Sequence, residues 1–184
     1  MPNATARPLQ LCLTEDPWPH RPVIAALQRF LGPRLSSPDG VFIFDETAAA
    51  KQGTHSVGVA RQYSGTLGKV GNCQVGVFLA YASPLGHALL DGDLYLPQQW
   101  LDDPERRKAA AVPAATLMQT KGDLAWALLE PARQTGQWAV RWVPGDAVYG
   151  SHPPLRAGLD PAEPYTALGV RRPQEAVTRP PATA

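Results

Sequence analysis

The stretch Asn72-Cys-Gln-Val-Gly-Val-Phe-Leu-Ala-Tyr81 is rich in residues that favour β-structure, and it predicts a β-strand. The turn sequence Ser83-Pro-Leu-Gly86 follows, and residues 87–95 predict a second strand, so the two segments are expected to form a hairpin. Upstream, Val41-Phe-Ile-Phe44 is a short apolar run that we expect to be a strand buried on both faces, with Asp45 at its carboxyl end. An antiparallel group of three strands therefore opens the predicted fold.

Helices and further strands are predicted after this group. Thr120-Lys-Gly-Asp123 resembles a capping box, so a helix is expected to begin there, and Pro131 should kink that helix or end it early. Residues 138–143 predict a strand, residues 155–159 a short helix and residues 165–170 a last strand. This order of elements predicts an α/β fold in which a mixed sheet carries helices on its faces.

Length and composition limit the class of protein. The chain has 184 residues, of which 44% are hydrophobic, two cysteines and a formal net charge of +1. A chain of this length and hydrophobic fraction can form one domain with a core of its own. The composition excludes a disulfide scaffold, a membrane span and a globally basic nucleic-acid coat. The first ten residues lack the pattern of a signal peptide, so we expect a cytoplasmic protein.

Proline divides the chain into three parts. Of the 20 prolines, seven lie in residues 1–38 and seven in residues 151–184. We expect residues 1–38 to be a Pro-rich segment with one short helix at residues 22–31, residues 39–170 to be the folded domain, and residues 171–184 to be a disordered tail. The short helix has one apolar face, made of Val23, Leu27, Phe30 and Leu31.

The charges are unevenly distributed. Residues 47–90 contain no aspartate or glutamate, but they contain Lys51, Arg61 and Lys69. In a nearly neutral chain this segment produces a local positive field, which suits a nucleic-acid phosphate. An ordinary solvated basic face is the alternative interpretation.

Two aspartates, Asp45 and Asp146, each follow a predicted strand. If the two strands are parallel neighbours, about 5 Å apart, the carboxylates converge at one edge of the sheet. Two carboxylates form a suitable half-site for Mg²⁺, and paired metal ions catalyse phosphodiester chemistry. The alternative is that both aspartates only cap turns. Glu46 is not assigned to the site, because adjacent strand residues point to opposite faces.

Four stretches resemble the DDE-superfamily transposases (DDE endonucleases) of bacterial insertion sequences: Asp45-Glu-Thr47, residues 51–83, residues 94–100 and Asp146-Ala-Val-Tyr-Gly150. The block at residues 51–83 is highly specific, and the resemblance covers about residues 39–170. The resemblance implies an RNase H-like fold. It also implies metal-dependent hydrolysis at the transposon ends, followed by attack of a 3′-hydroxyl on target DNA.

The resemblance also implies roles for individual residues. Asp45 would be the first catalytic acid and Asp146 the second, and both would bind Mg²⁺ or Mn²⁺. Lys51, Arg61 and Lys69 would contact DNA phosphates. The expected partners are the DNA of the transposon ends and of the target, and also a second copy of the chain or a full-length transposase. We expect the chain to act at the bacterial nucleoid and not to bind a membrane.

The family pattern requires a third acid, a glutamate on a helix after the last strand. The residues that follow Val170 contain one acid, Glu175, which lies between Pro173 and Pro180 in a poor setting for a long helix, and Glu163 precedes the last predicted strand. We therefore expect a domain that is incomplete at its carboxyl end and truncated at both ends, with impaired cleavage. The alternative is a non-catalytic remnant that is inert or binds DNA or full-length transposase.

Overall fold

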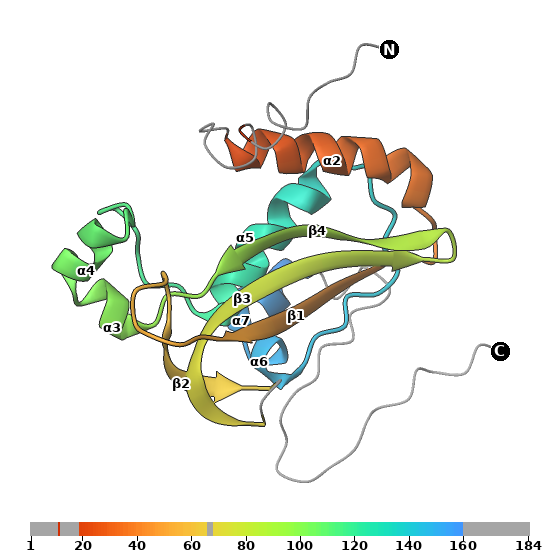
Figure 1. Ribbon diagram of the computed structural model, residues 1–184. Helices are drawn as coiled ribbons and strands as arrows, with labels where there is room; N and C mark the ends of the chain where they lie inside the picture. Colours follow the sequence, from red (N-terminus) through yellow and green to blue (C-terminus); the bar gives the residue numbers. More distant parts are fainter. Residues whose placement is uncertain (1–10, 12–18, 66–67, 160–184) are drawn as a thin grey trace, which may run out of the picture.

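The sheet is organised around β3 (Lys69–Ser83), to which each of the other described strands pairs in antiparallel orientation. β1 (Val41–Ala50) runs along one edge of β3, and β2 (Ala60–Ser64) and β4 (Gly86–Leu94) run along the other (Figure 1). The predicted group of three antiparallel strands is confirmed in β1, β3 and β4. The short strand β2 is an additional element that the sequence analysis did not identify.

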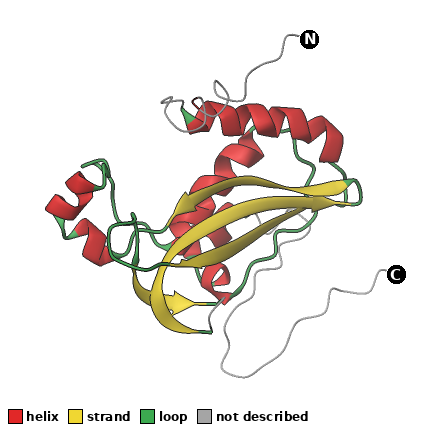
Figure 2. Ribbon diagram, viewed as in Figure 1, coloured by secondary structure: helices red, strands yellow, loops and turns green. Residues whose placement is uncertain are grey.

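The computed structural model describes residue 11, residues 19–65 and residues 68–159, so the last predicted strand, the tail, Glu163 and Glu175 lie outside it. Figure 2 shows helices packed beside the sheet, which confirms the predicted α/β class. The helices are α2 (His20–Leu35), α3 (Gln98–Leu101), α4 (Pro104–Ala109), α5 (Lys121–Gln134), α6 (Ala147–Gly150) and α7 (Pro153–Gly158). None of these described helices is long and apolar enough to cross a membrane.

The structure of β1 corrects two predictions. Phe42 and Phe44 are buried, but the side chain of Ile43 between them is 36% exposed, so the strand is buried on one face only. The strand also continues to Ala50, which places Asp45 in its middle and not at its end. The physical reason is the long ladder with β3, which provides backbone hydrogen-bond partners beyond the apolar run.

Side-chain alternation gives the sheet two different faces. The inner face contains the buried Val77, Leu79 and Tyr81 of β3, which share one core cluster with Leu124 and Leu128 of α5. The outer face carries the side chains of the residues that alternate with these along each strand. On β1 it includes Ile43, Asp45 and Thr47, and these three are exposed. Each large apolar side chain buried on the inner face contributes about 1.5–3 kcal/mol to folding.

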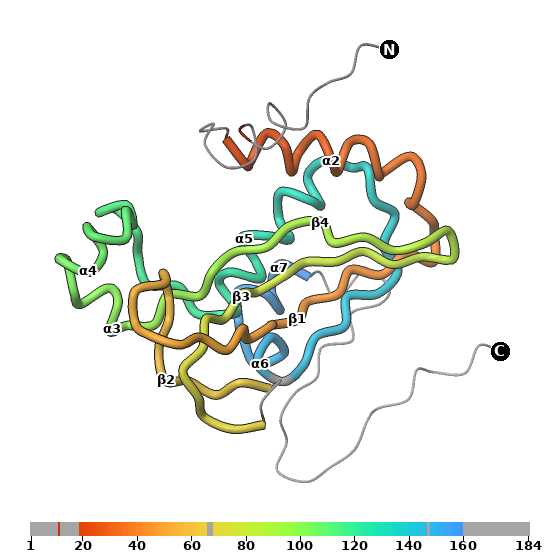
Figure 3. The backbone as a smooth tube through the Cα atoms, viewed as in Figure 1, coloured from red at the N-terminus to blue at the C-terminus, as the bar shows by residue number. Residues whose placement is uncertain are grey.

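Residues 138–143, predicted as a strand, do not form a regular strand. They make one parallel bridge, in which Val41 pairs with Trp142, and the Phe42 amide donates to the Trp142 carbonyl at 3.0 Å. Pro144 comes directly after them and has no N–H to continue a ladder. The segment is nevertheless a parallel neighbour of β1, and Figure 3 shows it running beside the start of β1 before it turns towards α6.

Helix α5 begins with the predicted capping box. The Thr120 hydroxyl accepts a hydrogen bond from the Asp123 amide at 3.1 Å, and the Asp123 carboxylate accepts one from the Thr120 amide at 2.7 Å. The helix does not end at Pro131 but continues to Gln134. Buried residues on both sides of the proline, Leu128 and Ala132 among them, hold this part of the helix in the core and compensate for the missing hydrogen bond.

Helix α2 extends further than predicted and buries a different side. Gln28 is buried and donates to the Leu90 carbonyl of β4 at 3.3 Å, and Leu31 and Leu35 pack against the core. The other apolar residues of the predicted face are exposed: Val23, Leu27 and Phe30. The contact with β4, to which Arg21 adds ion pairs with Asp91 and Asp93, therefore sets the rotation of this helix.

The Tyr81 hydroxyl joins β3 to two loops, because it accepts from the Ser37 amide at 3.0 Å and donates to the Ala139 carbonyl at 2.8 Å. We expect Tyr81→Phe to lower the free energy of unfolding in urea by about 1–3 kcal/mol, since both backbone groups lose a buried partner. The control Tyr63→Phe changes a side chain that is 60% exposed and should have little effect. Equal stabilities of the two variants would contradict this role of the Tyr81 hydroxyl.

Candidate active site

The parallel bridge joins the two segments that carry the predicted acids. Asp45 is four residues beyond Val41, and Asp146 is four residues beyond Trp142, the two residues that form the bridge. The two segments leave the bridge in the same direction, and the second turns towards α6 as it reaches Asp146. Both acids are exposed, Asp45 on the outer face of β1 and Asp146 just before α6.

Each aspartate uses one carboxylate oxygen in a local hydrogen bond. Oδ1 of Asp45 accepts from the Glu46 amide at 2.8 Å, and Oδ1 of Asp146 accepts from the Val148 amide at 2.8 Å. The Asp146 carbonyl also accepts from the Gly150 amide at 2.9 Å, so Asp146 does cap the turn of α6. Capping fixes the orientation of this carboxylate through one oxygen and is compatible with a second role for the other oxygen.

Tyr149, three residues after Asp146, lies within electrostatic range of the acids. Its side chain is buried, with its ring 5.8 Å from the ring of Phe44. Burial raises the pKa of Tyr149 strongly, and the charges of Glu46, Asp146 and Asp45 raise it further. The three carboxylates are therefore all close enough to act electrostatically on one phenol, which stays protonated. Within the described part of the chain, the Tyr149 hydroxyl has no hydrogen-bond partner.

Glu46 faces away from Asp45, towards α5. Its Oε1 atom lies 2.6 Å from Nζ of Lys121, the first residue of α5, and the lysine also lies 5.9 Å from the centre of the Tyr95 ring. The second oxygen, Oε2, is buried and has no partner among the described residues. Glu46 thus serves to attach β1 to the start of α5, and side-chain alternation separates it from the acid on the outer face.

A second contact holds the start of α5 against α7. His152 Nδ1 accepts from the Leu155 amide at 3.2 Å, which leaves the proton on Nε2, 3.0 Å from Asp123 Oδ1. Hydrogen bonds from the Thr120 side chain and backbone lower the pKa of Asp123, and His152 lowers it to a smaller extent. Because α6 lies between Asp146 and His152, this contact and the burial of Tyr149 together fix the turn that carries Asp146.

The chemistry of the donor set fits a hard divalent cation. In the ranges that the structure describes, no group of three or more His, Cys, Asp and Glu side chains is arranged to hold a metal ion. Asp45 and Asp146 therefore offer two carboxylates. Mg²⁺ is usually bound by one or two carboxylates, with water and substrate phosphate completing its octahedron. The pair suits a site completed by a bound phosphate, not a closed protein cage.

The three predicted DNA-contacting residues do not share one face. The Lys51 amide donates to the Asn72 carbonyl at 3.0 Å, which extends the β1–β3 ladder by one residue, and Asn72 pairs with Arg61 on its other side. Lys51 and Arg61 therefore flank Asn72 on the outer face, two strand spacings or about 10 Å apart. Lys69 pairs with Ser64 and is separated from Asn72 by an odd number of residues along β3. Its side chain therefore points to the face opposite that of Lys51 and Arg61.

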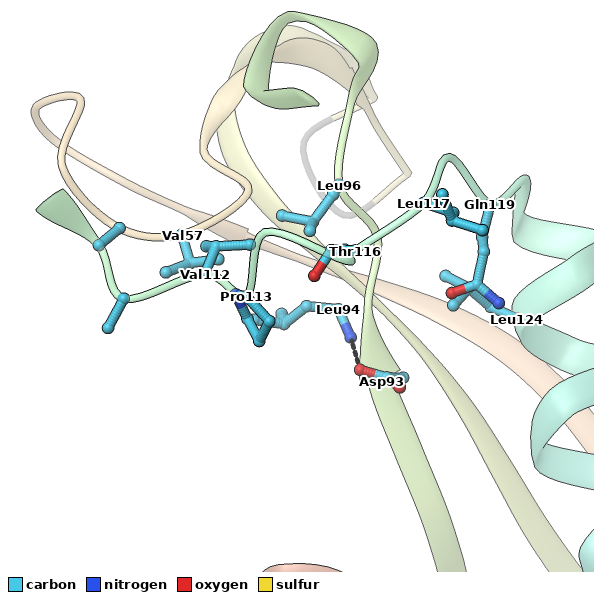
Figure 4. Close-up of a pocket in the computed structure, with 12 residues that line it drawn as sticks. Val57, Asp93, Leu94, Leu96, Val112, Pro113, Thr116, Leu117, Gln119 and Leu124 are labelled. Atoms are coloured by element: carbon cyan, nitrogen blue, oxygen red, sulfur yellow. Dashed lines mark hydrogen bonds between the residues drawn. The ribbon is translucent and has the colours of Figure 1, made fainter. Parts of the chain in front are cut away.

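Figure 4 shows a pocket whose lining residues include none of these three basic residues. Its volume is about 360 Å³, and it lies between Val57, the end of β4 and residues 110–119. Most of the residues that line it have apolar side chains, and Asp93, Thr116 and Gln119 have polar ones. None of the acids at the candidate site takes part in this pocket, so its shape has no bearing on the acid pair.

Two contributors to the site were not found by sequence reasoning. Tyr149 stands three residues after Asp146, within the segment already singled out, but its burial depends on Phe44 from a distant strand. Lys121 is the first residue after a recognisable capping Thr120, and nothing local identifies Glu46 as its partner. Both depend on contacts between segments that lie far apart in the sequence.

Tyr149 should make stability depend on alkaline pH. Because its pKa is raised in the folded state, the unfolded chain loses this proton near the ordinary value of 10.0 while the folded chain keeps it. The stabilisation that comes from the protonated Tyr149 is fully present below pH 10. Above pH 10 we expect the free energy of unfolding to fall by up to about 1.4 kcal/mol per pH unit. In Tyr149→Phe this part of the slope should be absent, whereas Tyr63→Phe should retain it. Identical pH profiles for the wild type and Tyr149→Phe would contradict the burial of this phenol.

Removing the lysine of the β1–α5 contact should be costly. In Lys121→Met, the Glu46 carboxylate, whose side chain is 27% exposed, loses its counter-charge, and we expect a loss of about 1–2 kcal/mol in urea unfolding. Adding Glu46→Gln to Lys121→Met should recover part of that loss, because no unpaired charge remains. Strictly additive effects of the two substitutions would show that the two groups do not interact.

Comparison with protein-family models matches residues 2–184 to a family described as DDE superfamily endonuclease. The searches of curated proteins and of solved structures give no match. The antiparallel sheet with flanking helices agrees with the RNase H-like fold that the sequence analysis predicted for such a protein. The family match extends over almost the whole chain, including α2. The chain belongs to the DDE superfamily endonucleases, which places it among DNA-cleaving proteins of the transposase type.

Proposed function

We propose that the chain binds DNA across the outer face of its sheet and brings Asp45 and Asp146 to the phosphate that is cleaved. The observation that supports this most directly is the bridge between Val41 and Trp142, from which both acids are four residues distant. Arg61, on the same face as Asp45, would neutralise DNA phosphates with its positive charge.

Asp45 and Asp146 would hold Mg²⁺ or Mn²⁺, which supplies an activated oxygen nucleophile and stabilises the oxygen that leaves. The reaction we propose is hydrolysis of a phosphodiester at the ends of an insertion sequence. The 3′-hydroxyl that is released then attacks a phosphorus of target DNA, so that one P–O bond forms while another breaks. Both acids are exposed, which leaves them accessible to a backbone as bulky as that of DNA.

A second candidate function is DNA binding without cleavage, either alone or together with another copy or a full-length transposase. It is favoured by the absence, among the residues placed by the structure, of three or more His, Cys, Asp or Glu side chains grouped to hold a metal ion. In that case the outer face would still bind DNA, and the chain would interfere with an active transposase. We propose the bacterial nucleoid as the place where either function is exerted.

Nicking of supercoiled plasmid in Mn²⁺ separates these functions. If the two acids bind the metal, Asp45→Asn and Asp146→Asn should each lower the nicking rate at least about a hundredfold, because each removes a charged ligand. Asp102→Asn, at an exposed carboxylate directly after α3, is the matched control and should nick like the wild type. Wild-type rates in both site variants would refute the acid pair. A wild-type chain that binds plasmid but does not nick it would favour the second function.

Salt dependence of duplex binding tests the basic residues separately. Arg61→Ala should weaken binding and lower the slope of log affinity against log salt by about 1, as expected for one lost phosphate contact. Lys69→Ala should have a smaller effect because that side chain points to the other face, and Arg29→Ala, on the exposed side of α2, should have none. A larger effect for Lys69 than for Arg61 would mean that DNA runs along a different face.

A further inference from the structure

The end of the sheet formed by β2 and the first part of β3 carries an exposed apolar pair. Tyr63 and Val70 stand directly opposite each other in the antiparallel register, and their side chains are 60% and 53% exposed. Figure 1 shows this two-stranded ribbon extending from the sheet on the side away from α2. Burial of an aromatic ring and a β-branched side chain in a core would stabilise the fold, yet both side chains are exposed to solvent here.

The strand register places this pair on the outer face, together with the candidate acid. Along β3, the partner of Asp45 is Phe78, the partner of Arg61 is Asn72 and the partner of Tyr63 is Val70. The three β3 residues are separated by even numbers, so their side chains and those of their partners point to the same face. This face therefore carries an acid, then two cations beside Asn72, and then an exposed aromatic ring.

The spacing suits a nucleic acid that lies along β3. Val70 and Phe78 are eight residues apart, which is at most roughly 27 Å along an extended strand. A DNA duplex covers that length in about eight base pairs. A backbone whose scissile phosphate lies at Asp45 can therefore continue past Arg61 and reach Tyr63 at the end of the ribbon.

The chemistry of the pair indicates which part of DNA it meets. Phosphate contacts need only cations, which Lys51 and Arg61 provide. A flat aromatic ring next to cations is instead typical of proteins that stack an unpaired base, since every base has a π-face and its phosphate can be neutralised nearby. The acid-free segment at residues 47–90 leaves no negative charge of its own to repel such a strand.

We propose that Tyr63 is a stacking platform for an unpaired nucleobase of DNA. Val70 supports the ring from the opposite strand, and Arg61, two residues before Tyr63 on the same face, binds an adjacent phosphate. This inference rests on the proposed function to the extent that the outer face is the one that binds DNA. It adds a preference for DNA with a single-stranded end over DNA that is fully paired.

The test compares two DNA probes with the full-length chain. One is a blunt duplex, and the other is the same duplex with a short single-stranded tail that contains 2-aminopurine, whose fluorescence is quenched when it stacks. The variants are Tyr63→Ala, the aromatic replacement Tyr63→Trp, and Phe30→Ala. Phe30 is a matched control, because it is an aromatic residue of similar exposure, 56%, on α2.

The wild type should bind the tailed probe more tightly and quench its fluorescence. Tyr63→Ala should weaken binding of the tailed probe by roughly five- to hundredfold, remove the quenching and change binding of the blunt duplex by less than twofold. Tyr63→Trp should restore both signals, and Phe30→Ala should behave like the wild type.

Three results would overturn the inference. The first is an equal loss of affinity for both probes in Tyr63→Ala, and the second is unchanged binding of the tailed probe. The third is conversion of an oligomer to a monomer by Tyr63→Ala in gel filtration, which would make the pair a contact between copies. A different result would contradict the proposed function itself, namely that the wild type does not bind even the blunt duplex in a salt-dependent way.

Discussion

Alternation of side chains along β3 is the constraint on which the rest of the structure depends. Its residues of one phase, such as Val77 and Leu79, are buried against α5, and those of the other phase face outwards. Because β1 and β2 are both registered to this one strand, the same alternation decides that Asp45 and Arg61 share a face. A slip of one residue in either pairing would bury the acid or turn the cation away.

The acid pair depends on a weaker element. Only one parallel bridge joins residues 138–143 to β1, and contacts of the residues on the carboxyl side of Asp146 add to it. Tyr149 buries its ring against Phe44, and His152 contacts Asp123 at the start of α5. Such an arrangement holds the backbone next to Asp146 while its carboxylate stays exposed, which is compatible with the proposed role at a DNA phosphate.

Local signals predicted the strands of the hairpin and the capping box. The features that they could not predict depend on contacts between distant segments. Asp45 lies within β1 because β3 continues the ladder past the apolar run, and α2 is rotated because Gln28 bonds to β4. The face to which Lys69 points could be assigned only once its pairing with Ser64 was known, because β2 has no apolar pattern that predicts a strand.

We propose that Asp45 and Asp146 act on one ion, and a double-mutant cycle for Mn²⁺ binding tests this without requiring cleavage. Calorimetric titration of the wild type, Asp45→Asn, Asp146→Asn and the double variant gives the coupling between the two carboxylates. If they share an ion, each single substitution should weaken Mn²⁺ at least about tenfold, and the second should add much less than the first. Two independent and fully additive losses, or no loss at all, would contradict a shared site.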